Sequence, residues 1–246
     1  MLKLDYRGLR GLLADAPALR EAIGPRVAPH HTTFQKAAAR MLGDADVAKL
    51  LDATTAGGPP STPEVAVDST GLTTSHASEY FTRRRRETGA AGARTAYHAY
   101  SKLSLACDVV THEVLALCVG TGPGPDVTEF VGLVDAARGR RKFERVLADA
   151  GHDSESNHRH ARESLGVGTL VPATKGRPPK DGKPPTGRYR REMAESFDRE
   201  AYGQRWQVET VMSMVKRRMG WTTWSRSDPG RGRDPRLLAL THNVLI

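Results

Sequence analysis

Apolar positions near the start of the chain recur at helical spacing. Short apolar faces lie between residues 5 and 23 and end at a Gly-Pro pair. Thr32 and Gln35 then have the arrangement of a capping box, which predicts a helix beginning at Thr32, and Asp44 is expected to cap one more helix. We therefore predict a small all-helical module over residues 1–53, which is either a helix-turn-helix reader of DNA or a helical cap on the main domain.

The pattern changes after a stretch rich in Gly, Pro and Thr. Residues 54–63, TTAGGPPSTP, are predicted to be a linker. The next segment, EVAVDSTG, is expected to form a short strand that ends at Asp68, after which residues 69–71 turn the chain. Strands are also expected over residues 97–107 and 114–119, joined as an antiparallel hairpin.

The second half of the chain alternates strands with helices. A short apolar strand over residues 146–148 ends in Asp149, and a further buried strand is expected at residues 169–171. A long helix is expected from Tyr202 onward. This order of elements predicts an α/β fold for residues 64–246, in which helices flank a mixed sheet.

Composition and charge narrow the class of protein. The 246 residues are 38% hydrophobic and 26% charged, enough for one sizeable core and a small extra module. With no long apolar run and no secretory signal, we expect a cytoplasmic protein without a membrane partner. A net charge of +9 indicates a polyanionic partner, most plausibly nucleic acid.

Four polar residues of the stretch YGQRWQVETVMSMVK share one helix face. Tyr202, Arg205, Glu209 and Lys216 fall within an arc of roughly 60° at 3.6 residues per turn. The other faces are apolar, so the helix is expected to be largely buried, and a buried Glu209 needs partners or a metal ion. The alternative is a structural ion pair between Arg205 and Glu209 at i, i+4.

Two aspartates at strand ends extend this pattern. If the strands ending at Asp68 and Asp149 are parallel neighbours, both carboxylates emerge at one edge of the sheet, where Glu209 can reach them. Three carboxylates without His or Cys at ligand spacing suit a hard cation, Mg²⁺ or Mn²⁺. Two such ions can promote phosphodiester cleavage.

These residues together resemble a known family. Asp68 in VDSTG, Asp149 in ADAGHD and the Tyr-Arg-Glu-Lys helix spacing are similar to the three signature blocks of bacterial insertion-sequence transposases of the DDE type, whose core is RNase H-like. The resemblance covers roughly residues 64–245. It also extends weakly to LDYRGLRGLLAD near the N-terminus.

The resemblance implies both an activity and its residues. Mg²⁺- or Mn²⁺-dependent hydrolysis at element ends and strand transfer into target DNA would use metal ions held by Asp68, Asp149 and Glu209. Tyr202, Arg205 and Lys216 would contact phosphates of double-stranded DNA, with a homodimer expected in the DNA complex.

Two other functions stay open at this stage. Family members usually have more sequence at both ends, so we expect a truncated chain, and the alternative function is a DNA-binding remnant that does not cut. A host nuclease of the same fold is a weaker option, which the occurrence of strand joining would distinguish.

The run of four arginines and the three tryptophans could each serve either DNA binding or structure. The run Arg83, Arg84, Arg85 and Arg86 is either a DNA-binding groove or an exposed face. The residues Trp206, Trp221 and Trp224 either stack on an unpaired base or pack in the core.

Polar residues near the predicted helix starts suggest capping. Asp126 and Asp153 are expected to be N-caps. His152, His158 and His160 supply only part of a zinc ligand set, so we expect them to lie at a solvated helix start.

Overall fold

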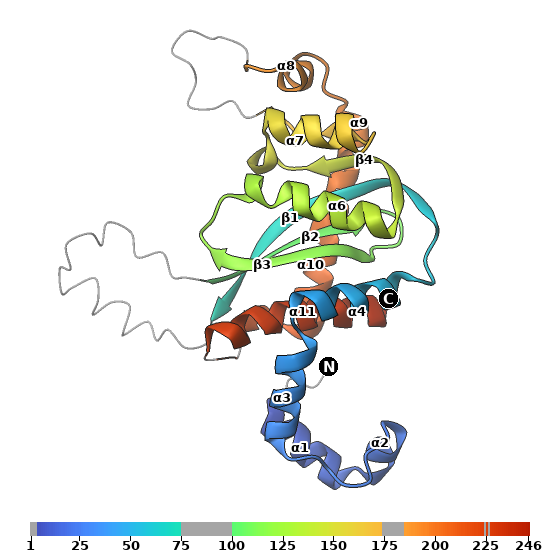
Figure 1. Ribbon diagram of the computed structural model, residues 1–246, viewed down its shortest axis with the longest axis vertical. Helices are drawn as coiled ribbons and strands as arrows, with labels where there is room; N and C mark the ends of the chain where they lie inside the picture. Colours follow the sequence, from blue (N-terminus) through green and yellow to red (C-terminus); the bar gives the residue numbers. More distant parts are fainter. Residues whose placement is uncertain (1–3, 75–99, 174–184, 224, 226) are drawn as a thin grey trace, which may run out of the picture.

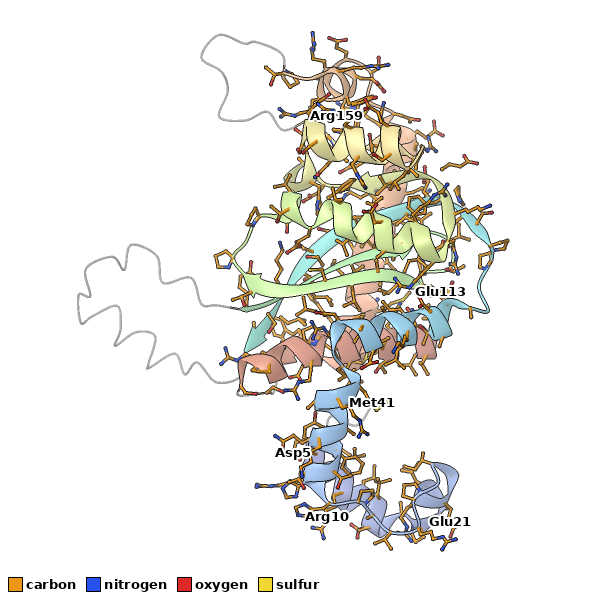
Figure 2. All side chains as sticks on the ribbon, in the orientation of Figure 1. Asp5, Arg10, Glu21, Met41, Glu113 and Arg159 are labelled. Atoms are coloured by element: carbon orange, nitrogen blue, oxygen red, sulfur yellow. The ribbon has the colours of Figure 1, made fainter. Side chains whose placement is uncertain are left out.

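The computed structural model describes residues 4–74, 100–173, 185–223, 225 and 227–246. Its first three helices form an arm that projects away from the rest of the molecule (Figure 1). They are α1 (Tyr6–Asp15), α2 (Pro17–Ala22) and α3 (His31–Met41). Figure 2 shows the labelled side chains of Asp5, Arg10, Glu21 and Met41 along this arm, with Met41 at the end nearest the rest of the molecule.

The centre of the molecule is a mixed sheet. Its strands are β1 (Ser61–Thr74), β2 (Tyr100–Asp108), β3 (Val114–Gly122), β4 (Lys142–Ala148), β5 (Gly168–Leu170) and β6 (Thr222–Thr223). The main strand order is β3-β2-β1-β4-β5, with β6 paired to the far end of β1. The strands β1, β2 and β3 are antiparallel, whereas β4 and β5 are parallel to β1.

The other helices that the structure describes surround the sheet and cover both of its faces. They are α4 (Asp44–Thr55), α6 (Phe130–Arg140), α7 (Glu155–Arg159), α8 (Arg188–Glu195), α9 (Arg199–Tyr202), α10 (Trp206–Met219) and α11 (Asp228–Leu245). Short helical turns are η1 (Asp126–Thr128), η2 (Ala150–His152), η3 (His160–Ser164) and η4 (Gly203–Arg205). In Figure 1, α6 and α10 cross opposite faces of the sheet.

Strand alternation builds two separate cores. Successive side chains of a strand point to opposite faces. Ala66 and Leu72 of β1 therefore pack in one core with α4, α10 and α11, whereas Val65 and Val67 pack in the other core with α6. The same alternation directs the polar residues that follow along β1, with even-numbered positions facing α10 and odd-numbered positions facing α6.

This architecture confirms the α/β fold with a mixed sheet flanked by helices, and the hairpin of β2 and β3. Across the described ranges, no helix combines the length and the apolar character that a membrane span requires. The division into a module over residues 1–53, a linker and a domain over residues 64–246 stays a prediction. The observed connection is shorter than residues 54–63, because α4 extends to Thr55 and β1 begins at Ser61.

Two local expectations were wrong. β1 does not end at Asp68, because residues 69–72 continue to pair with β2, from Ser69 with Ser104 to Leu72 with Ser101. α3 begins at His31 with His30 as N-cap, and the Thr32 hydroxyl bonds the His30 ring at 2.9 Å instead of capping the helix.

Candidate active site

The two aspartates follow paired residues of neighbouring strands. β1 and β4 are parallel, and their register pairs Val67 with Ala148, so Asp68 and Asp149 follow at the same level. The expectation that these strands are parallel neighbours is confirmed. Asp149 lies where β4 ends, whereas Asp68 lies inside β1 and is flanked on its other side by β2.

The Asp68 carboxylate is held in a partly buried position. Its side chain is 18% exposed, and Oδ1 accepts a hydrogen bond of 2.7 Å from the Ser69 backbone N–H. Burial raises the pKa of Asp68, the Ser69 N–H lowers it, and the negative charge of Asp149 raises it again, for a net increase. The negative charges of Asp68 and Asp149 repel each other, so a positive charge beside them is stabilising.

Arg205 supplies positive charge from the helix side. Its guanidinium lies 3.2 Å from Asp68 Oδ2 and also pairs with the Glu209 carboxylate. The i, i+4 ion pair predicted as an alternative is therefore present, and the same guanidinium links Glu209 to the sheet. Arg205 also lies 5.9 Å from the centroid of the Tyr202 ring, a cation–π arrangement.

The helix itself differs from the prediction. A single buried helix was expected from Tyr202 onward, but α9 ends at Tyr202, η4 follows, and α10 begins at Trp206. The Glu209 side chain is 56% exposed, so the expectation of a buried Glu209 was wrong. The cause is that only one side of α10, including Val208 and Val211, packs against the sheet.

Lys216 completes the contact between α10 and β1. Its Nζ donates a hydrogen bond of 2.6 Å to the Thr70 hydroxyl. Thr70 is two residues beyond Asp68 and therefore lies on the same face of β1. The structure thus brings Arg205, Glu209 and Lys216 of the helix signature to the strand that carries Asp68.

The three carboxylates are close but are not arranged as metal ligands. In the parts of the chain that the structure describes, no three His, Cys, Asp or Glu side chains could hold one ion as they stand. Arg205 lies between Asp68 and Glu209 instead. The oxygen donors themselves are of the kind that Mg²⁺ and Mn²⁺ prefer.

Asp126 and Asp153 are not N-caps. Asp126 accepts hydrogen bonds from Ser69 and Lys102, and Asp153 pairs with Arg190 at 2.8 Å. α7 instead follows Ser154, which makes no side-chain cap. Long-range polar partners bind these carboxylates, and sequence spacing gives no signal of such partners.

The three histidines do not form a solvated helix start. His152 and His158 are each only 1% exposed, and His160 lies 2.6 Å from Asp135. His152 Nε2 is 4.0 Å from Asp149 Oδ1, and burial lowers the pKa of His152 despite the surrounding carboxylates. The sequence named this imidazole only as part of a zinc ligand set and gave no signal that it is buried beside Asp149.

Of the remaining candidates, Arg83 to Arg86 and Trp224 lie outside the described residues. Trp206 and Trp221 are 55% and 63% exposed, so packing in the core is wrong for both. Stacking on a base stays a prediction.

The sequence matches a known family. The profile described as "Transposase DDE domain" aligns with residues 59–231, well over half of the chain. The chain belongs to the DDE transposase family. This assignment agrees with the resemblance carried by Asp68, Asp149 and the helix signature.

Two solved transposase structures show a loose similarity to this DDE transposase. The "pre-cleavage Mos1 transpososome" is 10% identical, with a TM-score of 0.29, over 100% of this chain and 78% of the other. The "Mos1 mariner paired end complex with Mn" is 12% identical, with a TM-score of 0.28, over 99% and 78%. These superpositions are loose, and the assignment rests on the family profile. Comparison with curated proteins gives no match.

Proposed function

We propose that this DDE transposase cuts phosphodiester bonds at the ends of an insertion sequence and joins the freed 3′ hydroxyls to target DNA. The observation that carries the proposal is the register of β1 and β4, which places Asp68 beside Asp149. Arg205 adds support, because its guanidinium pairs both with Asp68 of the sheet and with Glu209 of α10. The catalytic carboxylates in this proposal are Asp68, Asp149 and Glu209.

The same carboxylates are proposed to hold Mg²⁺ or Mn²⁺, as two ions. All three offer oxygen ligands, and burial, together with the negative charge of Asp149, raises the pKa of Asp68, so a bound cation would offset the cost of keeping this carboxylate charged. Such ions supply activation of the attacking oxygen and neutralisation of charge on the phosphate.

The proposed reaction has two steps, hydrolysis and strand transfer. In the first, the oxygen of water attacks phosphorus, the bond from phosphorus to the 3′ oxygen breaks, and that oxygen leaves with a proton. In the second, the freed 3′ hydroxyl attacks a target phosphorus and gives up its proton as the new P–O bond forms, the bond from that phosphorus to the target's own 3′ oxygen breaks, and this oxygen leaves with a proton. Neither step needs an oxidant or a nucleotide cofactor.

The cations of the helix are proposed to bind the DNA backbone. Arg205, Lys216 and the Tyr202 hydroxyl surround the carboxylates and can donate hydrogen bonds to phosphate oxygens next to the cut. The net charge of +9 favours double-stranded DNA as a ligand. A homodimer that brings two ends together, and a DNA contact by Arg83 to Arg86, belong to the same proposal.

A cleavage assay on a duplex from the DNA flanking the coding sequence tests the proposal. With Mg²⁺ or Mn²⁺, the native chain is expected to nick the duplex, and Glu209→Gln is expected to lose at least about 10²-fold in rate. Glu192→Gln is the matched control, because Glu192 is also an exposed glutamate paired with an arginine, Arg162 at 2.7 Å, outside the site.

Two outcomes would contradict the proposal. Equal rates for native protein and Glu209→Gln would remove Glu209 from the mechanism. Tight DNA binding by the native chain with no cleavage in either metal would favour the alternative, a DNA-binding remnant that does not cut.

A further inference from the structure

A buried lysine lies behind the active site, on the face of the sheet that α6 covers. The Lys102 side chain is only 4% exposed, and its Nζ lies 2.7 Å from Asp126 Oδ1 and 3.1 Å from Glu129 Oε1. It also donates to the Gly124 carbonyl at 3.2 Å. A buried ammonium requires such partners, so this cluster fixes η1 and the start of α6 on the sheet.

Asp126 also contacts the strand that carries Asp68. The Ser69 hydroxyl donates a hydrogen bond of 2.5 Å to Asp126 Oδ1, and the Ser69 backbone N–H donates to Asp68. Adjacent residues of a strand face opposite sides, so Ser69 faces α6 while Asp68 faces α10. Asp126 therefore contacts β1 on the face that α6 covers. The contact is at Ser69, the residue next to the proposed metal ligand Asp68.

The other oxygen of Asp126 reaches the turn that follows Asp149. A Cβ added at Gly151 would lie 3.0 Å from Asp149 Oδ1 and 3.2 Å from Asp126 Oδ2, so both oxygens approach one point beside the glycine. The Gly151 N–H donates to Asp149 Oδ1 at 2.9 Å. Asp126 thus lies against both segments that carry the aspartates.

A second contact fastens the same turn to η1. The Asn157 side-chain amide donates to the carbonyl of Val127 at 2.9 Å and to the carbonyl of His152 at 3.0 Å. The segment after Asp149 is therefore attached to the short helix that begins at Asp126. Glu129, the other partner of Lys102, bonds Ser104 of β2 and is not within hydrogen-bond reach of either aspartate segment.

We propose that Asp126, held by Lys102, is a positioning residue that sets the spacing between Asp68 and Asp149. The inference rests on the proposed function, because its consequence is measured as the affinity of the two aspartates for a divalent cation. Partners that orient metal ligands typically change metal affinity by about 10- to 100-fold when they are mutated.

The test compares two isosteric variants of carboxylates that share the same lysine. Mn²⁺ binding to the full chain is measured by electron paramagnetic resonance of the free ion, for native protein, Asp126→Asn and Glu129→Gln. Asp126→Asn is expected to weaken binding at least about tenfold, and Glu129→Gln is expected to change it by less than about threefold. A purely structural role in neutralising Lys102 predicts equal effects, which would overturn the proposal.

Further variants separate the possible failures. If Asp126→Asn does not fold by circular dichroism, Ser69→Ala tests the same contact, and unchanged Mn²⁺ affinity in Ser69→Ala would overturn the proposal. Asp149→Asn reports on the proposed function itself. Native binding that Asp149→Asn weakens and Asp126→Asn leaves unchanged refutes only the positioning role, whereas no binding by native protein refutes both.

Discussion

At the scale of single residues, Arg205 lies at the centre of the proposed site. Its guanidinium contacts Asp68 and Glu209, two of the three carboxylates proposed as cation ligands. A guanidinium bound to carboxylates cannot at the same time offer those hydrogen bonds to a phosphate. Metal binding and DNA binding both require the Arg205 guanidinium to separate from these carboxylates. Each ligand is therefore expected to favour the binding of the other.

The first prediction follows from this competition. Arg205→Gln removes the competing cation, so Mn²⁺ affinity of the DNA-free protein is expected to rise by up to about fivefold, the value of an ion pair of about 1 kcal/mol. Affinity for duplex DNA is expected to fall in the same variant. Both are measured by titration, with Arg140→Gln as control because Arg140 pairs with Asp52 at 2.7 Å, away from the site. A fall in Mn²⁺ affinity would contradict the competition.

The sequence could predict some of these residues and not others. Asp68 and Asp149 were recognisable because each ends an apolar run, and Glu209 because helical spacing groups it with Arg205. Lys102 gave no such signal, since a lysine inside a strand usually points to solvent. Only the folded register, which pairs Gly71 with Lys102, turns its side chain toward Asp126.

At the scale of elements, α8 depends on one carboxylate from α7. Glu155 accepts hydrogen bonds from the backbone N–H groups of Arg188, Tyr189 and Arg190, at 2.9, 3.3 and 3.1 Å. Burial raises the pKa of Glu155, but these three donors together lower it by more. The net pKa is therefore below its ordinary 4.5. Gly187 has φ of 103°, and a Cβ there would lie 2.2 Å from the Glu155 carboxylate, so the approach requires glycine.

The second prediction concerns this anchor. Glu155→Ala is expected to expose the first turn of α8, seen as faster hydrogen exchange of its amides, at a cost of about 1 kcal/mol in unfolding free energy. Because the folded-state pKa is lowered, the contribution is complete above about pH 4.5 and is lost as the pH falls through the folded value. Unchanged exchange in α8 would show that other contacts hold the helix.

Element boundaries were less predictable than element types. The hairpin and the parallel pairing of β1 with β4 were expected and are present. β1 continues past Asp68 because β2 supplies hydrogen-bond partners for a Ser-Thr-Gly stretch that reads as a turn in isolation. The break between α9 and α10 was also hard to predict, because Gly203 is the one helix-breaking residue between them.

At the scale of the whole molecule, the sheet brings together residues that are far apart in the chain. Its central strand β1 carries Asp68, its neighbour β4 delivers Asp149, and α10 crosses the same face with Glu209 (Figure 1). The opposite face supports them through Lys102 and Asp126. The proposed site therefore draws on residues from both faces of the sheet.

Iron-directed cleavage of the polypeptide can map where a bound divalent ion lies. Fe²⁺ in place of Mg²⁺, with ascorbate and peroxide, generates radicals that cut the polypeptide beside the ion, and mass spectrometry locates the cuts. If the three carboxylates share bound cations, cuts are expected near Asp68, Asp149 and Glu209 in one sample, and all of them are expected to be lost together in Asp149→Asn. Cuts near only one of the three residues, or none above background, would contradict a shared cation site.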